Sequence, residues 1–192
     1  MKTTRLVALL ATAVCGTTLG AALLVPAADA APPAARDDPA STTRAAGGWE
    51  PYRTAPFRLA GGTRCPFGLA GTPIRDRERI RTLARLPDGT PTVQQVAGPL
   101  VVRYTNTDTG ATVRRDLTGR ATVSYREDGS FTETLDHGTL AVGLAATDPG
   151  GPGFFVLTGT GFRLDVSAGG ARTVFLGTGR VENLCTTLAV RR

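Results

Sequence analysis

Histidine, lysine and cysteine are scarce in this 192-residue chain, which has one His, one Lys and 3 Cys. Three cysteines are too few for a disulfide-dense scaffold, and no C-x-x-C or Cys/His set has the spacing of a zinc site. A Ser-His-Asp triad would have to use His137, and no serine stands in a G-x-S-x-G motif. No glycine-rich stretch is followed by Lys-Ser or Lys-Thr, as a phosphate loop requires. We therefore predict no catalytic residue, no metal site and no cofactor.

Aromatic residues make up only 6% of the chain and charged residues 20%, whereas hydrophobic residues reach 41%. This apolar content excludes a wholly disordered chain, and the length suits one ordinary domain. The formal net charge is +6. Between residues 57 and 188, however, 15 Arg stand against 12 Asp plus Glu, which leaves only +3. A charge this small gives no reason to expect a nucleic-acid partner.

Residues 1–30 have the pattern of a secretory signal peptide. Lys2 and Arg5 precede an uncharged run from Leu6 to Val25, and Ala28-Asp29-Ala30 is an A-x-A cleavage site. We predict cleavage after Ala30, a secreted mature protein and no stable membrane insertion after cleavage. The alternative is an uncleaved anchor, because a run of about 20 residues is long enough to span a bilayer.

Cleavage would remove Cys15 and leave two cysteines, Cys65 and Cys185. An even pair in an exported chain is typical of one disulfide. We predict that these two residues are bridged.

Residues 31–56 contain five prolines and almost no branched apolar residues. Such a segment buries too little surface to offset its ordering entropy, so we predict a flexible leader, followed by a single domain from residue 57 to 192. Trp49 and Tyr52 are its only large apolar residues. We expect them to dock on the folded body, and the alternative is a segment that binds a partner.

From Phe57 onward, short runs with alternating apolar residues are separated by turn residues, which predicts an all-β antiparallel meander of about nine or ten strands. Turns are expected at 87–89, 108–110, 128–130, 136–138 and 148–151. We favour a small closed or nearly closed β-barrel over a two-sheet β-sandwich. The closely spaced glycines in segments 158–161 and 177–179 indicate bulges, tight bends or the close approach of another backbone. Two such sites on successive strands suggest strong curvature, which favours a closed barrel.

Arginines occupy every second position from Arg75 to Arg81, with Asp76 and Glu78 between them. The stretch fits a helix, a strand or a loop. We favour a strand from about Arg79 onward and an edge or loop before it. Arginines on one face of an extended chain suit a polyanion, but the interleaved acids favour an edge strand protected by its charges.

Four acidic residues lie close together in the sequence: Glu127, Asp128, Glu133 and Asp136. Paired carboxylates serve acid–base chemistry in glycoside hydrolysis, which also needs a cleft and substrate-binding aromatics. Turn chemistry already accounts for Asp128 and Asp136, and an exposed strand position or a partner across the strand accounts for Glu133. We therefore assign no catalytic role to this group.

Several segments resemble a family of small exported actinobacterial proteins of unassigned function. They are Cys65–Phe67, Leu100–Gly110, Asp128–Ser130, Gly153–Gly159 and Gly179–Cys185. The resemblance covers residues 65–185 and rests on turns and cysteines. It implies a signal peptide, one end-to-end disulfide and an antiparallel β fold, and it carries over no active site.

Three functions remain open. The first, which we favour, is a non-enzymatic exported β module that binds a cell-surface polymer or another protein. The second is a calycin-like barrel that holds a small apolar ligand in a cavity lined by Val102, Tyr104, Phe155, Phe162 and Leu176. The third is a barrel cyclase or isomerase, which would need polar groups converging inside that cavity.

Overall fold

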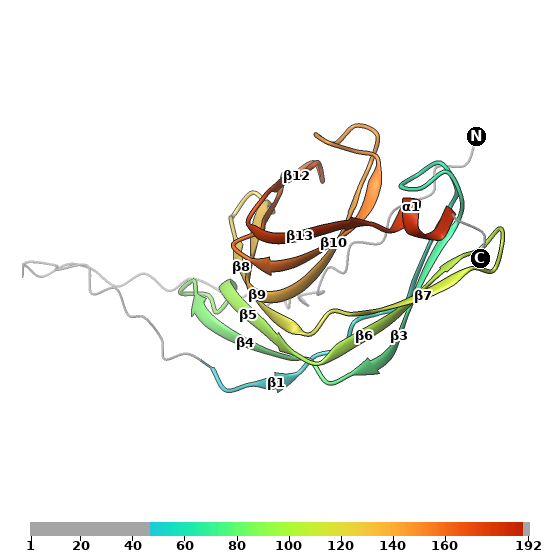
Figure 1. Ribbon diagram of the computed structural model, residues 1–192. Helices are drawn as coiled ribbons and strands as arrows, with labels where there is room; N and C mark the ends of the chain where they lie inside the picture. Colours follow the sequence, from blue (N-terminus) through green and yellow to red (C-terminus); the bar gives the residue numbers. More distant parts are fainter. Residues whose placement is uncertain (1–46, 190–192) are drawn as a thin grey trace, which may run out of the picture. The chain divides into compact units, whose positions relative to one another are not determined.

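The computed structural model describes residues 47–189, in which β-strand is the main regular structure (Figure 1). The expected signal peptide and most of the expected leader lie outside these residues. The prediction of an all-β antiparallel fold is confirmed, and twelve strands begin between residues 57 and 181, more than the nine or ten expected. The elements are β1 (Glu50–Pro51), β2 (Phe57–Leu59), β3 (Leu69–Asp76), β4 (Arg79–Arg85), β5 (Pro91–Gly98), β6 (Leu100–Asn106), β7 (Thr112–Asp116), β8 (Gly119–Tyr125), β9 (Phe131–Leu144), β10 (Gly153–Thr160), β11 (Arg163–Val166), β12 (Arg172–Phe175), β13 (Thr178–Asn183) and α1 (Leu184–Ala189).

The strands form two sheets. Sheet A has the order β1-β4-β5-β8-β9-β10-β13, and the β11–β12 hairpin pairs with the first half of β9. Sheet B has the order β2-β3-β6-β7. Short turns join most sequential strands, which is why neighbours in each sheet run antiparallel.

Three strands of sheet B continue directly into strands of sheet A (Figure 1). The links are Arg77-Glu78 between β3 and β4, Pro99 between β5 and β6, and Leu117-Thr118 between β7 and β8. Backbone hydrogen bonds continue through the links, since the N–H of Arg77 donates to the carbonyl of Pro99 at 2.8 Å. The two sheets are therefore joined by bent strands and not by loops.

A row of directly paired glycines crosses five strands of sheet A near these bends. Gly98 pairs with Gly119, Gly119 with Gly138, Gly138 with Gly159, and Gly159 with Gly179. We call these five residues the glycine row. Glycine inside a strand permits a sharp bend or a close backbone approach.

Gly159 and Gly179 in the glycine row lie closer together than any side chain would allow. A Cβ atom on Gly179 would stand 1.9 Å from the carbonyl oxygen of Thr158, and one on Gly159 would stand 2.0 Å from that of Thr178. Both glycines also have positive φ, +145° and +151°. The predicted close approach of another backbone in these segments is confirmed.

The turn predicted at 136–138 is wrong, because these residues lie inside the long strand β9. The register with β8 skips Asp136, so the segment forms a β-bulge. An extra residue shifts the alternation of side chains by one. Leu135 and Leu140 therefore share one face, and both pack in the same core.

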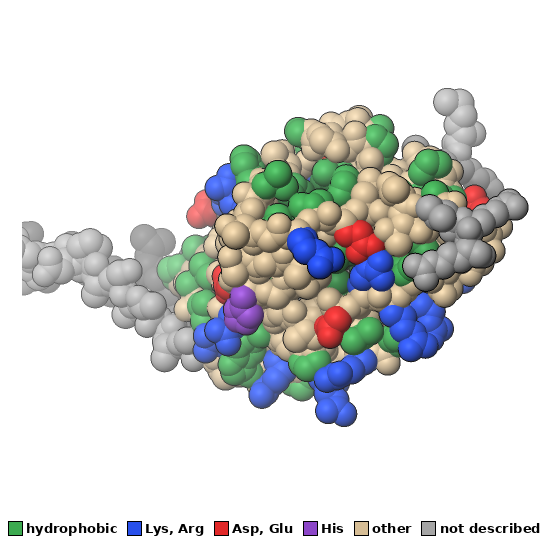
Figure 2. All heavy atoms as spheres, in the orientation of Figure 1, with side chains coloured by type: hydrophobic (Ala, Val, Ile, Leu, Met, Phe, Trp, Pro, Cys, Tyr) green, Lys and Arg blue, Asp and Glu red, His purple; other side chains and the backbone are tan. Residues whose placement is uncertain are grey.

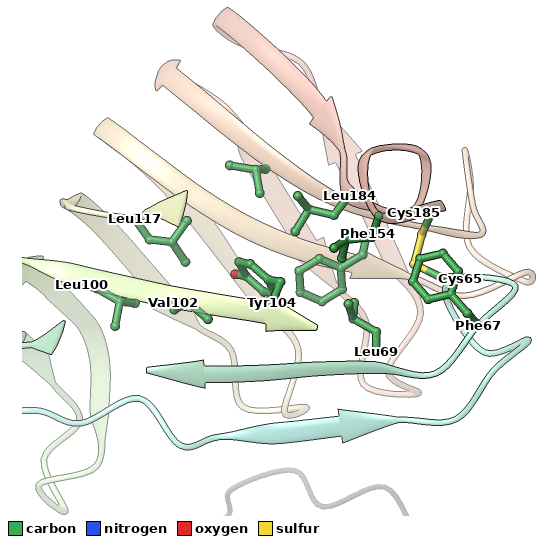
Figure 3. Close-up of a cluster of buried hydrophobic side chains, with 12 residues drawn as sticks. Cys65, Phe67, Leu69, Leu100, Val102, Tyr104, Leu117, Phe154, Leu184 and Cys185 are labelled. Carbon is green, nitrogen blue, oxygen red and sulfur yellow. A yellow bond between two sulfur atoms is a disulfide. The ribbon is translucent and has the colours of Figure 1, made fainter. Parts of the chain in front are cut away.

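The first core lies between sheet B, β10 and α1, and it contains the disulfide (Figure 3). Phe154 stacks with Phe57 at 5.5 Å between ring centroids and contacts Tyr104 at 5.4 Å. Cys65 and Cys185 are bonded and buried in the same cluster, so the predicted disulfide is confirmed. Its buried members are Cys65, Phe67, Leu69, Leu100, Val102, Tyr104, Leu117, Phe154, Val156, Leu184, Cys185 and Leu188.

A second core packs against the opposite side of β10, where side chains of β9, β10 and β11 meet. Successive side chains of β10 alternate between the cores, with Val156 in the first and Leu157 in the second. The buried members of the second core are Leu135, Val142, Leu144, Leu157, Phe162 and Leu164.

The structured domain begins before Phe57, so the predicted flexible leader is too long at its C-terminal end. β1 pairs with β4, and the N–H of Gly47 donates to the carbonyl of Thr82 at 2.9 Å. The guanidinium of Arg81 lies 4.7 Å from the ring centroid of Trp49, so this aromatic docks on the folded body as expected. Backbone pairing of β1 with β4 orders this segment although it has few apolar side chains. Its composition therefore did not predict that it is ordered.

The stretch from Arg75 to Arg81 contains parts of two strands. The strand predicted from Arg79 is confirmed as β4. The edge or loop predicted before it is also confirmed, because Arg77-Glu78 forms the link and Arg75, at the end of β3, pairs with β6 on one side only. β2 pairs with β3 only from Leu69 to Gly71. The alternating arginines therefore belong to different sheets and form no single row.

Candidate functional site

The five residues expected to line one cavity lie in different places. Val102 and Tyr104 are buried in the first core, whereas Phe162 is buried in the second and Phe155 packs against it. Leu176 is 75% exposed, so its assignment to an interior wall is wrong. Leu176 directly follows the end of β12, and the apolar pattern of the sequence around it did not predict that its side chain is exposed.

One hollow of about 280 Å³ opens at the surface between the turn at 126–130 and the β11–β12 hairpin. Arg126, Asp128, Asp165, Ser167 and Thr173 are among its lining residues. The lining mixes polar and apolar surface and the hollow is open to solvent, in contrast to the enclosed apolar cavity expected for a calycin-like barrel.

Chemically richer groups project from one face of sheet A. The register places Thr82 opposite Gln94, Gln94 opposite Val123, and Val123 opposite Glu133. Residues directly opposite one another point to the same side of a sheet. Tyr125, two residues beyond Val123, lies on this side too, and its hydroxyl donates to Oε1 of Gln94 at 3.1 Å.

The segment before β2 brings Tyr52 to this face, beside Glu78 in the link between β3 and β4. The N–H of Tyr52 donates to the carbonyl of Glu78 at 3.0 Å. Two residues later, the hydroxyl of Thr54 donates to Oε2 of Glu78 at 2.5 Å, and the N–H of Thr54 donates to Oδ2 of Asp76 at 2.8 Å. Residues 52–54 thus hold the buried Glu78 carboxyl in place.

We call Tyr52, Glu78, Tyr125 and Glu133 the acid–tyrosine cluster, because their charges act on one another. Burial raises the pKa of Tyr52, and the carboxylates of Glu78 and Glu133 raise it further. Burial also raises the pKa of Tyr125, with a further contribution from Glu133. The four groups therefore occupy one electrostatic neighbourhood.

Both carboxyl groups of the cluster hold their protons more tightly than usual. Burial raises the pKa of Glu133 to about 7, an effect that Arg172 opposes and Glu78 reinforces. Burial likewise raises the pKa of Glu78, against the hydrogen bond from Thr54. Near neutral pH Glu133 is therefore present in both its protonated and its ionised form, and the protonated form donates a hydrogen bond as well as accepting one.

The cluster is also accessible from outside. Tyr52 is 39% exposed and Tyr125 is 38% exposed, whereas Glu78 is buried. Two aromatic rings thus stand at the surface beside the carboxyl groups. This arrangement offers an apolar ring face and hydrogen-bonding groups to one bound molecule.

The four acids that are close in sequence do not come together in space. Asp136 lies on the opposite face of sheet A from Glu133, where its Oδ2 accepts from Thr122 at 2.9 Å and from Gln95 at 3.1 Å. Asp128 caps its turn by accepting from the N–H of Ser130 at 2.9 Å. Glu133 is not an exposed strand residue, and the residues directly across from it are Val123 and Leu164, neither of which is a charged partner.

Sequence reasoning missed Glu78 and Tyr125, and it named Tyr52 only as part of a segment that docks on the folded body or binds a partner. One signal for Glu133 was present, because it stands between Phe131 and Leu135 on the same side of a strand, which puts a carboxyl group on an apolar face. His137 is exposed and takes no part in the cluster.

Between residues 47 and 189, no group of three or more His, Cys, Asp and Glu side chains has the arrangement of a metal site. Over the same described part of the chain, no helix has the length and apolar character needed to cross a bilayer.

Replacing Glu133 with Gln is expected to stabilise the protein increasingly as pH rises. The folded state binds the Glu133 proton more tightly than the unfolded chain, whose pKa is ordinary, so wild-type stability falls as pH rises toward 7. Glutamine removes this penalty, which is on the order of 2 kcal/mol at pH 8 and small at pH 4.5. Urea denaturation of both proteins at the two pH values measures the difference. E127Q, at an exposed turn position, is the control, and an E133Q advantage independent of pH would contradict the prediction.

Comparisons of the chain with protein-family models, with curated protein sequences and with solved structures gave no match.

Proposed function

We propose that this chain is an exported, non-enzymatic binding module and that the acid–tyrosine cluster is its ligand-binding surface. The observation that carries the proposal is the pairing of two exposed tyrosine rings with two carboxyl groups of raised pKa on one side of sheet A. Export is supported by the A-x-A site after the uncharged run and by the Cys65–Cys185 bridge, which suits an oxidising compartment.

The chemistry of the cluster fits an uncharged, hydroxyl-rich ligand such as a sugar unit of a cell-surface polysaccharide. Tyrosine rings offer flat apolar faces to the C–H side of a sugar, while the carboxyl groups and the amide of Gln94 can hydrogen-bond its hydroxyl groups. A protonated Glu133 does not repel a neutral ligand, and it enters the interface at a lower desolvation cost than a carboxylate.

Native electrophoresis through gels that contain soluble xylan, β-glucan or mannan tests the proposal. We expect at least one polysaccharide to retard the wild-type chain and the variants Y52A and Y125A to lose the retardation. F175A is the matched control, because Phe175 is an aromatic residue on β12 that is 42% exposed and lies outside the cluster. Equal losses in all three variants, or no retardation by any of these polymers, would refute the proposal.

A second function, acid–base catalysis at the same cluster, is favoured by one observation. The pKa of Glu133 lies near 7, where a carboxyl group can both donate and accept a proton at neutral pH. New reducing ends released from a bound polysaccharide by the wild type but not by E133Q would establish an enzyme. Retention of the polymer without cleavage would favour the binding module.

The arrangement of the strands also bears on the choice between a closed β-barrel and a two-sheet β-sandwich. Sheets A and B enclose the first core between them and keep separate edge strands, which supports the two-sheet sandwich alternative.

A further inference from the structure

The outer face of sheet B carries four arginines. Phe57, Leu59, Leu69, Leu100, Val102, Tyr104 and Val113 point into or pack against the first core, so the residues between them on each strand point outward. The outward positions include Arg58 on β2, Arg75 on β3, Arg103 on β6 and Arg114 on β7, all exposed. We call these four residues the arginine face. Figure 2 shows Arg side chains projecting along the lower side of the molecule, where Figure 1 places β3, β6 and β7.

The register sets two of these arginines directly against each other. Arg103 pairs with Arg114 across β6 and β7. Like charges directly opposite each other on a sheet are unfavourable. Within residues 47–189 neither guanidinium has a hydrogen bond to, or an ion pair with, another described side chain. Their five N–H donors each are therefore presented to solvent without a partner among the described residues.

Acidic residues are nearly absent from this face. Asp116 is the one acid at the outward positions of β2, β3, β6 and β7, and its Oδ1 accepts from the N–H of Thr118 at 2.8 Å. Four positive charges therefore stand against one negative charge on one side of a sheet. In the sequence, Asp76 and Glu78 alternate with the arginines of the Arg75–Arg81 stretch, whereas neither acid lies on the arginine face.

The other outward-facing residues of sheet B limit which chemical class of partner can bind this face. Thr72 is opposite Arg103 on one side, and Thr105 is opposite Thr112 beside the arginine pair. Hydroxyl groups and guanidinium forks both donate to phosphate oxygens. The outward strand positions hold no aromatic residue on which a nucleic-acid base could stack.

We propose that the arginine face binds a linear phosphate-bearing polymer, with Arg103 and Arg114 together engaging its phosphates. Neighbouring strands are about 4.8 Å apart, which brings two guanidinium groups to one phosphate or to two successive ones. A bound phosphate removes the repulsion between the two arginines. This site is separate from the acid–tyrosine cluster, so either one can operate without the other.

Long-chain inorganic polyphosphate is the probe for this site. We expect it to bind the wild-type chain at low salt, and we expect R103A/R114A to bind at least about tenfold more weakly. The dependence of log K on log salt should become less steep by about 1.5 in this variant, because two phosphate contacts are lost. R120A/R180A is the charge-matched control, since both arginines are exposed and lie on β8 and β13 of sheet A.

Thermal unfolding checks that the variants are folded, and R103A/R114A should be no less stable than the wild type because a like-charge pair is removed. An equal loss of polyphosphate binding in R120A/R180A would mean attraction by net charge alone and would overturn the proposal. It would also be overturned if the wild type did not bind polyphosphate, or if it bound single-stranded DNA or vesicles of anionic phospholipid in preference to it.

Discussion

Loss of the Cys65–Cys185 bridge is expected to lower the free energy of unfolding by about 4 kcal/mol. The bridge joins residues 120 positions apart and so restricts nearly the whole described chain in its unfolded state. In the chain-entropy account a loop of this length contributes about 4–5 kcal/mol, and removing native disulfides from small secreted domains costs about 2–5 kcal/mol. Urea denaturation of wild type and C65A/C185A measures the difference.

The bridge also fixes α1, which at six residues is too short to be stable alone. Leu184 and Leu188 of this helix are buried in the first core, and the amide of Asn106 donates to the carbonyl of Leu188 at 3.2 Å. We therefore expect faster amide exchange in α1 once the bridge is gone. A reductant should destabilise the wild type and leave C65A/C185A unchanged. A loss below about 1 kcal/mol would contradict the role assigned to the bridge.

Replacing Gly179 with Ala is expected to destabilise the protein by about 3 kcal/mol or more. Two costs add at this position: the positive φ of +151° strains any L side chain, and the new Cβ would stand 1.9 Å from the carbonyl oxygen of Thr158. The obstacle is backbone, so β10 and β13 must separate to relieve it. Thermal and urea denaturation measure the effect.

G129A is the matched control for this substitution. Gly129 also has a positive φ, +82°, but a Cβ there would meet no atom within 4 Å. It should cost only the backbone strain, about 1 kcal/mol. Equal destabilisation by G129A and G179A would show that the close approach of β10 and β13 is not what requires glycine.

Local features of the fold were accessible from the sequence because they depend on neighbouring residues. The turn at 128–130 follows from Asp128 and Gly129, and the strand from Arg79 follows from apolar alternation. The disulfide followed from a count of cysteines. Features that depend on register were not accessible: composition suggested a turn at 136–138, but pairing with β8 on one side of β9 and with β10 on the other keeps the strand continuous through a bulge.

The glycine row and the acid–tyrosine cluster illustrate the same limit. The glycines of the row recur at intervals of 19 to 21 residues, a regularity visible in the sequence, but only the pairing of strands shows that they face one another. Likewise Glu133 lies 55 residues from Glu78, and only a folded sheet places them together. For the same reason, the sequence suggested a row of arginines from Arg75 to Arg81, whereas the folded sheet places Arg58, Arg75, Arg103 and Arg114 on one face.

The three bent strands that pass from sheet B to sheet A leave no position at which this domain could be divided. The links have only one or two residues, and a fragment that ends at Pro99 keeps β3 and β5 but loses their partners β6 and β8. A shortened version limited to sheet B would also expose the apolar side of β3 and β6 that β10 and α1 cover. We therefore expect a fragment limited to sheet B not to fold by itself, so tests of the arginine face require the full chain.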